Sequence, residues 1–415
     1  MSDIKLSICI PTYNRAPFLR YLLAKFVEQK AIDFPYEIVI SDNASTDDTT
    51  TVVQEFAALG LPIRYYKREV NDGGWANLTN AYQHADGQYS LYLADDDLLI
   101  FENLRPAILY LDANPDVVVC HAPWFLYDAV DDKDEQPFYQ IEKARRFSQR
   151  NFAALFSFIT DRHIFPEIAI YRTDALRSIT VPREFCYWAF SYLAQAIDIG
   201  AVAFVEKPFY RSVTRTNVVR DREQGGHEET MTSWDRYRGG LEYFLYLGAK
   251  RGQIDLSGPN KAKYEQICSL FTLRRMAVAL RMWVARKEYI KAYEIYARLC
   301  FNGLGRHPEV ERVRDKLPLM AGVQSLARKI NAASNIRFLV LDKVSDIKSL
   351  AGLLFEMGLG KSVGIMPPPE YDMQQLTPVS AVFTSDGARR ELFIRQGYRP
   401  GLIFCENDIV GGLPV

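Results

Sequence analysis

The chain has 415 residues, more than one hydrophobic core usually organises, and this length predicts two or three domains. Its hydrophobic share of 48% and charged share of 24% are typical of a globular protein and exclude a largely disordered chain. The formal net charge of -1 gives no global attraction to nucleic acid, so we expect no nucleic-acid partner.

The six cysteines are scattered and show neither CxxC nor metal-ligand spacing, which indicates reduced, buried thiols. The first residues run directly into a strand pattern and lack the long apolar core of a signal peptide. No stretch reaches about 18 uninterrupted apolar residues. We therefore expect a cytoplasmic protein whose only membrane contact is peripheral, at the inner face.

The chain alternates strand and helix patterns up to about residue 213. We predict strands at 6–10, 37–40, 63–67, 89–93, 117–121, 168–172 and 202–206, and helices over 16–29 and 74–84, with a further capped helix ending at 56. Such alternation is typical of an α/β fold with a doubly wound sheet.

Two further segments follow with different patterns. Between about 228 and 317 apolar residues recur at helical intervals only, which predicts helices over 234–251, 259–286 and 288–301. The second and third of these are rich in Lys and Arg, which fits either a solvated face or docking on an anionic membrane surface or glycolipid. After about 335 a small α/β unit is predicted, without GxGxxG or a P-loop.

The expected domains are therefore 1–215, 228–330 and 335–415. We assign ligand chemistry to the first. The all-helical segment is expected to serve acceptor, membrane or oligomer contacts, and the small C-terminal unit packing or oligomerisation.

Two acidic clusters come directly after predicted strands. Ser41 to Asp47 reads SDNASTD, and Leu93 to Asp97 reads LADDD. Open α/β sheets bind ligands at the carboxyl ends of their parallel strands. Three adjacent aspartates repel one another unless a cation or hydrogen-bond donors lie close, and hard divalent cations prefer such oxygen ligands. The clusters therefore predict a metal-bound phosphate ligand, although Asp97 alone also fits a cap for a helix starting at Leu98.

The first strand ends in Pro11-Thr12-Tyr13-Asn14-Arg15, where proline stops the strand at the rim of the sheet. Tyr13 can stack on a nucleobase, and Asp42 can accept the imide hydrogen of a uracil or thymine ring. Lys67 and Arg68 follow the third strand and can neutralise a phosphate. Each residue alone fits an ordinary turn or surface role equally well.

The order and spacing of PTYNR, SDNASTD and NDGGWANLTNAYQHADGQYSLYLADDD resemble the nucleotide-sugar-binding half of the family 2 inverting glycosyltransferases with the GT-A fold. The resemblance covers about the first 210 residues and is strongest up to Phe101. It implies a GT-A doubly wound mixed sheet and transfer of a sugar from a nucleotide-diphosphate donor, a UDP-sugar above all, to a glycan or lipid-linked acceptor. It also implies Mn²⁺ or Mg²⁺ and a role in bacterial surface-polysaccharide synthesis.

The same resemblance implies roles for single residues. Thr12, Tyr13 and Asp42 would hold the base, and Asp95 would meet the ribose. The full set expected to bind the nucleotide is Pro11, Thr12, Tyr13, Arg15, Asp42, Arg68, Asn77 and Asp95, and the expected metal ligands are Asp96 and Asp97.

The sequence departs from the family at the catalytic base. The family commonly places an acidic pair about a dozen residues before the glycine that precedes the last core strand. Gly200 matches that glycine, but Tyr187-Trp188-Ala189 fills the acidic slot. Glu184 is our first candidate base and Glu167 our second, while both also fit surface or capping roles. The family's later histidine ligand is not evident, and His227 is a candidate replacement.

Two other interpretations compete with a transferase. Sugar-phosphate nucleotidyltransferases share this sheet architecture but open with a glycine-rich, basic loop, which PTYNR is not. A degenerate, non-catalytic protein that binds sugar nucleotides or scaffolds a polysaccharide assembly complex remains the alternative, because the acidic pair is missing.

Overall fold

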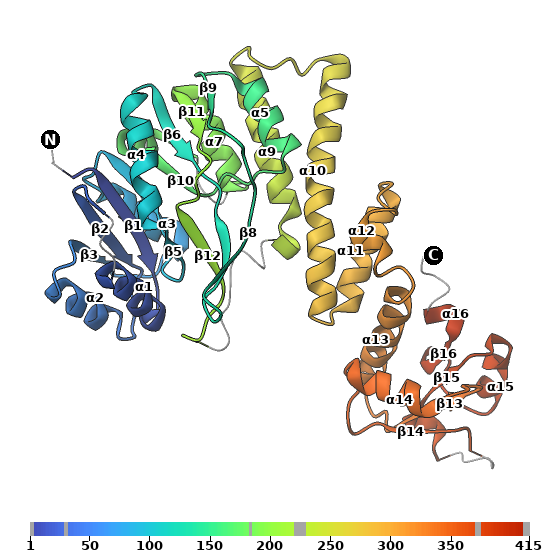
Figure 1. The fold of residues 1–415 in the computed structure, drawn as a ribbon. Coiled ribbons are helices and arrows are strands. Elements are labelled where there is room, and N and C mark those ends of the chain that lie inside the picture. The colour runs from blue at the N-terminus through green and yellow to red at the C-terminus, as the bar shows by residue number, and fades with distance from the viewer. Residues whose placement is uncertain (1–3, 29–31, 182–184, 220–229, 370–374, 410–415) are drawn as a thin grey trace. The chain divides into compact units, whose positions relative to one another are not determined.

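The computed structural model describes residues 4–28, 32–181, 185–219, 230–369 and 375–409 (Figure 1). The chain divides into two compact units, one of residues 1–224 and 235–272, the other of residues 225–234 and 273–415. All six cysteines lie in the described ranges as free thiols, and five of them are buried. The three domain limits expected from sequence stay a prediction.

The first unit is built on an eight-stranded mixed sheet with the order β3-β2-β1-β4-β10-β6-β11-β9. The strands are β1 (Leu6–Thr12), β2 (Tyr36–Asp42), β3 (Ile63–Lys67), β4 (Tyr89–Tyr92), β6 (Val117–His121), β9 (Arg145–Phe147), β10 (Ala169–Arg172) and β11 (Ala201–Phe204). The first four run parallel, and β10 lies antiparallel between β4 and β6. The expected doubly wound mixed sheet is confirmed.

Helices connect these strands, and the first three of them lie where the sequence predicts helices. They are α1 (Ala16–Glu28), α2 (Thr49–Ala58), α3 (Gly73–Gln83), α4 (Leu104–Ala113), α5 (Phe152–Asp161), α6 (Thr173–Ser178) and α7 (Trp188–Ile199). In α1, Phe18, Leu19, Leu22, Leu23 and Phe26 form one buried stripe. Each such side chain stabilises the fold by roughly 1.5–3 kcal/mol when it is buried.

A second sheet in this unit was not predicted from sequence. It contains β5 (Leu98–Leu99), β12 (Tyr210–Arg215), β7 (Phe125–Asp128) and β8 (Lys133–Pro137), in that order. Because Leu98 and Leu99 form a strand, the alternative of a helix starting at Leu98 is wrong. The sheet matters for function because β12 lies against the aspartate cluster.

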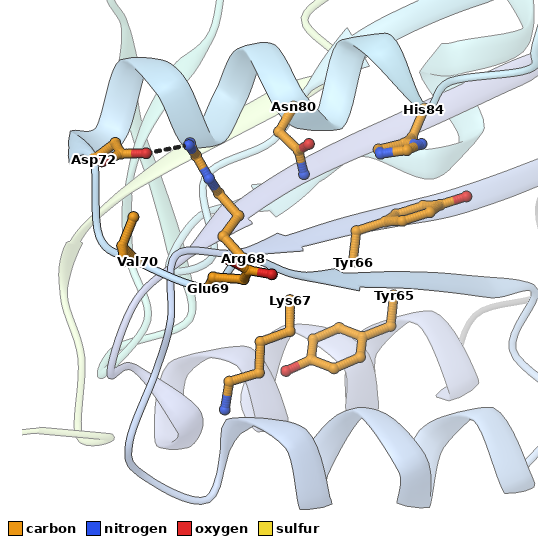
Figure 2. A pocket seen from close by; sticks show the side chains of 9 residues that line it. All are labelled: Tyr65, Tyr66, Lys67, Arg68, Glu69, Val70, Asp72, Asn80 and His84. Carbon is orange, nitrogen blue, oxygen red and sulfur yellow. Dashed lines mark hydrogen bonds and ion pairs between the residues drawn. The ribbon is translucent and has the colours of Figure 1, made fainter.

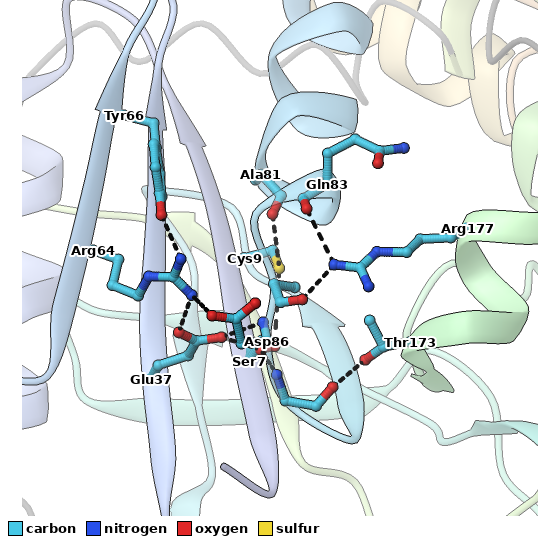
Figure 3. A network of polar contacts seen from close by, with 12 residues as sticks. Ser7, Cys9, Glu37, Arg64, Tyr66, Ala81, Gln83, Asp86, Thr173 and Arg177 are labelled. Carbon is cyan, nitrogen blue, oxygen red and sulfur yellow. Dashed lines mark hydrogen bonds and ion pairs between the residues drawn. The ribbon is translucent and has the colours of Figure 1, made fainter. Parts of the chain in front are cut away.

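A polar network fixes the amino ends of the central strands (Figure 3). Glu37, 2% exposed, accepts hydrogen bonds from the Ser7 hydroxyl at 2.5 Å and from the Asp86 N–H at 2.7 Å, and it pairs with Arg64 at 2.9 Å. A Cβ on Gly87 would lie 2.7 Å from the Ser7 nitrogen, so only glycine fits there. This network locks the strand register at the end opposite to the acidic clusters.

The remaining helices and a third sheet follow. They are α9 (Trp234–Lys250), α10 (Gly258–Ala285), α11 (Tyr289–Phe301), α12 (Pro308–Glu311) and α13 (Leu317–Ala332), then β13 (Phe338–Asp342), α14 (Ile347–Glu356), β14 (Gly364–Met366), β15 (Ser380–Thr384), α15 (Arg390–Arg395), β16 (Ile403–Cys405) and α16 (Glu406–Ile409). The third sheet is parallel, with the order β14-β13-β15-β16. It belongs to the small α/β unit that was predicted after about residue 335. Among the described residues no helix is both long and apolar enough to cross a membrane.

Candidate functional site

The carboxyl ends of β1, β2 and β4 bring three of the expected nucleotide-binding residues together. Thr12 of β1 pairs in register with Asp42 of β2. The Thr12 hydroxyl donates a hydrogen bond of 2.7 Å to Asp95, which lies just beyond β4. Asp42 and Asp95 are 0% and 5% exposed, so both carboxylates are set into the sheet edge.

Arg15 bridges two members of the aspartate cluster. Its Nε lies 3.0 Å from an oxygen of Asp95, and its Nη2 forms an ion pair with Asp96. The guanidinium also lies 4.6 Å from the ring centroid of Phe18. Burial raises the pKa of Asp95, and the charge of Arg15 opposes that rise. Arg15 was expected to bind the nucleotide. In the structure its guanidinium contacts Asp95 and Asp96, and Asp96 is an expected metal ligand.

Asp97 is bonded by β12, whereas Asp95 and Asp96 contact Arg15. The two oxygens of Asp97 accept hydrogen bonds of 2.8 Å each, one from the Tyr210 hydroxyl and one from the Val213 N–H. Both donors belong to β12. We interpret Asp97 as a support of the second sheet, and its expected role as a metal ligand stays a prediction.

Asp42 is held by its own neighbours. One oxygen accepts from the Ser45 N–H at 2.8 Å and the other from the Tyr65 hydroxyl at 2.5 Å. A carboxylate offers about four acceptor positions, so Asp42 retains capacity for a hydrogen from a base. The expected turn around Asp42 and the expected ligand contact are therefore compatible.

Two further expected residues differ sharply in exposure. The Tyr13 side chain is 42% exposed at the end of β1 and is accessible for stacking. Asn77 of α3 is 2% exposed, donates to the Thr12 carbonyl at 3.1 Å and accepts from the Ser41 hydroxyl at 2.6 Å. Asn77 thus ties α3 to the ends of β1 and β2, and we interpret it as a support of the site.

An open pocket of about 550 Å³ lies beside this edge, between β3 and α3 (Figure 2). Arg68 points toward α3 and pairs with Asp72 at 2.6 Å, whereas Lys67 points away from α3 and donates to the Ser45 carbonyl at 2.7 Å. The Tyr66 ring stacks on His84 with centroids 3.6 Å apart. Of the two basic residues, Arg68 therefore lines the side of the pocket nearer α3.

The acids at this edge suit a divalent cation. Asp95 and Asp96 converge on a single cationic group, the Arg15 guanidinium, and carboxylate oxygens are ligands for Mg²⁺ and Mn²⁺. Within the described ranges, no three acidic, His or Cys side chains are grouped so that they could hold a metal. A bound cation would take its remaining ligands from phosphate and water, as Mg²⁺ commonly does.

The first candidate base, Glu184, and the candidate metal ligand His227 lie outside the described residues, whereas Glu167, the second candidate base, lies within them. β10 pairs antiparallel with β4 through Ile170 and Leu91. Because the two strands run antiparallel, Glu167, two residues before β10, lies at the same sheet edge as Asp95, three residues after β4. Glu167 is half-buried and accepts a hydrogen bond from the Tyr187 hydroxyl.

Comparison with known proteins decides the family of this segment. Residues 7–180 match the family model described as Glycosyl transferase family 2. This segment is a family 2 glycosyltransferase domain. The resemblance to family 2 stated from PTYNR, SDNASTD and LADDD is thereby confirmed.

Relatives of the glycosyltransferase domain include bacterial glycosyltransferases. Abequosyltransferase RfbV of Salmonella typhimurium is 36% identical over 116 residues, 28% of this chain and 35% of that protein. The poly(ribitol-phosphate) beta-N-acetylglucosaminyltransferase TarS of Staphylococcus aureus is 32% identical over 113 residues, 26% and 19% of the two chains. The chain thus spans about a third or less of the length of these curated relatives.

Solved structures similar to the chain include S. aureus TarS 1–349 in complex with UDP-GlcNAc, with a TM-score of 0.47, 18% identity and coverage of 79% of this chain and 86% of that one. Mannosyltransferase PcManGT from Pyrobaculum calidifontis, in complex with GDP-Man and Mn2+, has a TM-score of 0.44 at 18% identity, with coverage of 79% and 88%.

Three hydrogen bonds between a tyrosine and a carboxylate in the first unit were not predicted from the sequence. Tyr65 bonds Asp42, Tyr210 bonds Asp97 and Tyr187 bonds Glu167. Each tyrosine lies far in sequence from its carboxylate and sits in no motif. Only the burial of a carboxylate, which demands a hydrogen-bond donor, could have signalled that such partners exist.

Proposed function

We propose that the chain is a metal-dependent glycosyltransferase that moves a sugar from a nucleoside-diphosphate donor to a hydroxyl of a glycan or lipid-linked acceptor, with inversion at the anomeric carbon. The observation that carries this proposal is the meeting of Thr12, Asp42 and the Asp95–Asp96 pair at one sheet edge of a family 2 domain. The bacterial polysaccharide relatives support surface-polysaccharide synthesis as the setting.

The nucleoside would bind across the ends of β1 and β2. Tyr13 is exposed and can stack on a base, and Asp42 can accept an imide hydrogen, which both uracil and thymine present. Asp95 would accept from a ribose hydroxyl, with Pro11 and Thr12 shaping the floor. Arg68 would lie toward the phosphates. A UDP-sugar is therefore the donor that we propose.

Transfer needs a base on one side of the anomeric carbon and charge neutralisation on the other. The oxygen of the acceptor hydroxyl forms a bond to the anomeric carbon while the hydroxyl proton passes to the base. The bond between the anomeric carbon and the diphosphate breaks, and the electron pair of that bond stays on the phosphate oxygen. Mn²⁺ or Mg²⁺, held by Asp96, would act as a Lewis acid toward that phosphate. Arg15 adds a fixed positive charge at the same edge. Of the two candidate bases, we favour Glu167, which precedes β10 at the sheet edge that also carries Asp95.

The cellular setting belongs to the same proposal. A cytoplasmic location at the inner face of the membrane would suit a lipid-linked acceptor, with peripheral contact through basic surfaces. We also propose that residues 228–415 form homo-oligomer contacts, on the basis of the sequence pattern of those segments.

The experiment that tests the function is a two-stage assay. First, thermal denaturation is followed with UDP-glucose, UDP-N-acetylglucosamine, GDP-mannose and a dTDP-sugar, each with and without Mn²⁺, because a ligand that binds the folded state raises Tm. Then release of the nucleoside diphosphate is measured for each donor that stabilises the protein. Stabilisation together with release supports the enzyme.

The alternative, a non-catalytic sugar-nucleotide-binding protein, is favoured by one observation, the tyrosine at position 187 where an acid was expected. It predicts metal-dependent stabilisation with no release above the rate in buffer. No stabilisation by any of the four donors would contradict both proposals.

A further inference from the structure

A second pocket of the first unit lies between β9 and α5 and has a volume of about 310 Å³. The pocket beside Arg68 adjoins β3, the first strand in the order of the main sheet, whereas β9 is the last. β9 lies four strands beyond β4 in that order, which is about 20 Å at the usual spacing of strands. A ligand in the second pocket would therefore be separate from a nucleotide bound at Asp95.

Three arginines line this second pocket, which we call the arginine pocket. Arg145 and Arg146 belong to β9, and Arg162 directly follows α5. Arg146 forms an ion pair with Asp116, whereas within the described ranges Arg145 and Arg162 have no ion-pair partner. Asp161 is the acid among the lining residues. Three positive charges thus face two negative ones, and the pocket keeps a positive surplus in a chain whose formal net charge is -1.

The rest of the lining is apolar and comes from Phe147, Ala154 and Phe158. The ring centroids of Phe147 and Phe158 lie 5.2 Å apart, so the two rings join β9 to α5. The Arg162 guanidinium lies over the Phe158 ring, 4.7 Å from its centroid. This cation–π contact restrains Arg162 where the charged and apolar parts of the lining meet. The pocket therefore offers guanidinium groups and apolar carbon side by side.

These features favour one class of ligand. A guanidinium binds phosphate oxygens through paired N–H groups. Several guanidinium groups around one pocket suit a group with more than one negative charge and several acceptor oxygens, as a phosphate monoester or a diphosphate has. The adjoining phenylalanine rings suit an apolar group attached to that phosphate.

We propose that the arginine pocket binds the phosphate or diphosphate of an ester that carries an apolar group. An isoprenyl diphosphate and a phospholipid with a terminal phosphate share this chemistry. The inference goes beyond the proposed function, because binding here needs neither a nucleotide sugar nor a divalent metal.

Isothermal titration of the full chain tests the inference with three probes: geranyl diphosphate, inorganic pyrophosphate and dihexanoyl phosphatidic acid. EDTA is present, so that no diphosphate is held through a metal at Asp96. We expect geranyl diphosphate to bind at least about tenfold more tightly than pyrophosphate, because its apolar group packs on the phenylalanine rings. Tighter binding of geranyl diphosphate than of phosphatidic acid would support an isoprenyl source, and the reverse a phospholipid source. Equal affinity for geranyl diphosphate and pyrophosphate would overturn the inference.

Arginine substitutions show whether the probe lies in this pocket. Arg145→Gln and Arg162→Gln should each weaken binding of geranyl diphosphate roughly tenfold or more, because each removes a charged donor. Arg150→Gln is the matched control, since Arg150 is exposed on the same segment and is not part of the lining. Its partner Asp198 keeps an ion pair with Arg251 in that variant. Equal losses in all three variants would indicate unspecific attraction and overturn the inference.

Two neighbouring alanines of α5 give a second test that leaves every arginine in place. Ala153 and Ala154 are both exposed, and of the two only Ala154 lines the pocket. Ala154→Glu should abolish measurable binding, because it adds bulk and a negative charge to the pocket, whereas Ala153→Glu should stay within about twofold of the original. Retained binding in Ala154→Glu would overturn the inference, as would a loss found in Arg68→Gln instead, which would place the diphosphate at the nucleotide edge. Failure of all three probes to bind would also overturn it and would leave the proposed function untouched.

Discussion

Arg15 and Asp96 form an ion pair at the carboxyl edge of the main sheet, and the same guanidinium contacts Asp95. A cation is thus already present where the acids converge. Any metal bound by Asp96 must share the carboxylate with Arg15 or displace it. This competition makes the affinity of the free protein for a metal lower than its acidic residues alone would suggest.

Replacing Arg15 with glutamine tests that competition. Arg15→Gln keeps a polar side chain and removes the positive charge, so we expect roughly a tenfold lower Kd for Mn²⁺ in the absence of nucleotide. Isothermal titration with Mn²⁺ alone measures it. Unchanged or weaker binding would show that Arg15 and the metal do not compete for Asp96.

Substitutions at Asp96 and Asp97, which are adjacent in sequence, are predicted to have different effects on metal-dependent binding and on stability. Asp96→Asn should abolish the Mn²⁺-dependent part of donor binding and change stability little. Asp97→Ala, by contrast, leaves the Tyr210 hydroxyl and the Val213 N–H without their acceptor. It should lower the unfolding free energy by about 2–3 kcal/mol, while metal-dependent binding persists. Urea unfolding and thermal shifts with Mn²⁺ distinguish the two, and full metal-dependent binding by Asp96→Asn would contradict our assignment of the metal site.

The strands of the first sheet could be predicted closely because they are buried and apolar. Val117–His121 matches the structure residue for residue, and Leu6–Ile10 is short by two residues only because the strand continues through Pro11. The edge strand Ile63–Lys67 also matches, although it is only partly buried and its sequence IRYYK is not apolar. Parallel strands in the middle of a sheet read as continuous apolar runs, which is the strongest local signal in a sequence.

The second sheet could not be predicted, since its strands are short or polar. Lys133–Pro137 contains three charged residues, and Leu98–Leu99 is two residues long. The pairing of Leu98–Leu99 depends on a strand more than 100 residues away, as between Tyr210 and Leu99. For the same reason the sequence could group Asp95, Asp96 and Asp97 but could not show that Asp97 faces β12.

The buried His121 makes acid sensitivity a further prediction. It is 0% exposed, stacks on Phe204 with centroids 4.8 Å apart, and burial lowers its pKa from 6.5 to about 3. A depressed pKa means that the unfolded chain binds the proton more readily between pH 3 and 6.5, so stability falls as the pH drops through that window. At pH 5 the histidine should cost about 2 kcal/mol relative to pH 8.

His121→Leu removes the titrating group and keeps a side chain of similar volume. We expect the drop in unfolding free energy from pH 8 to pH 5 to be smaller in this variant by about that amount. Urea unfolding at the two pH values measures it. An identical drop in both proteins would mean that other groups carry the acid sensitivity.

Tyr13 offers a direct test of how the nucleobase is held. Its ring is exposed at the end of β1, and stacking on a base is worth about 1–3 kcal/mol. Tyr13→Ala should therefore weaken binding of UDP roughly 10–100-fold in the presence of Mn²⁺, whereas Tyr13→Phe, which keeps the ring, should stay within about threefold of the original. Because the side chain is at the surface, neither change should alter Tm by more than about a degree. Equal losses in both variants would assign the contribution of Tyr13 to its hydroxyl, and equal retention would place the base elsewhere on the edge, with the pocket beside Arg68 as the next location to probe.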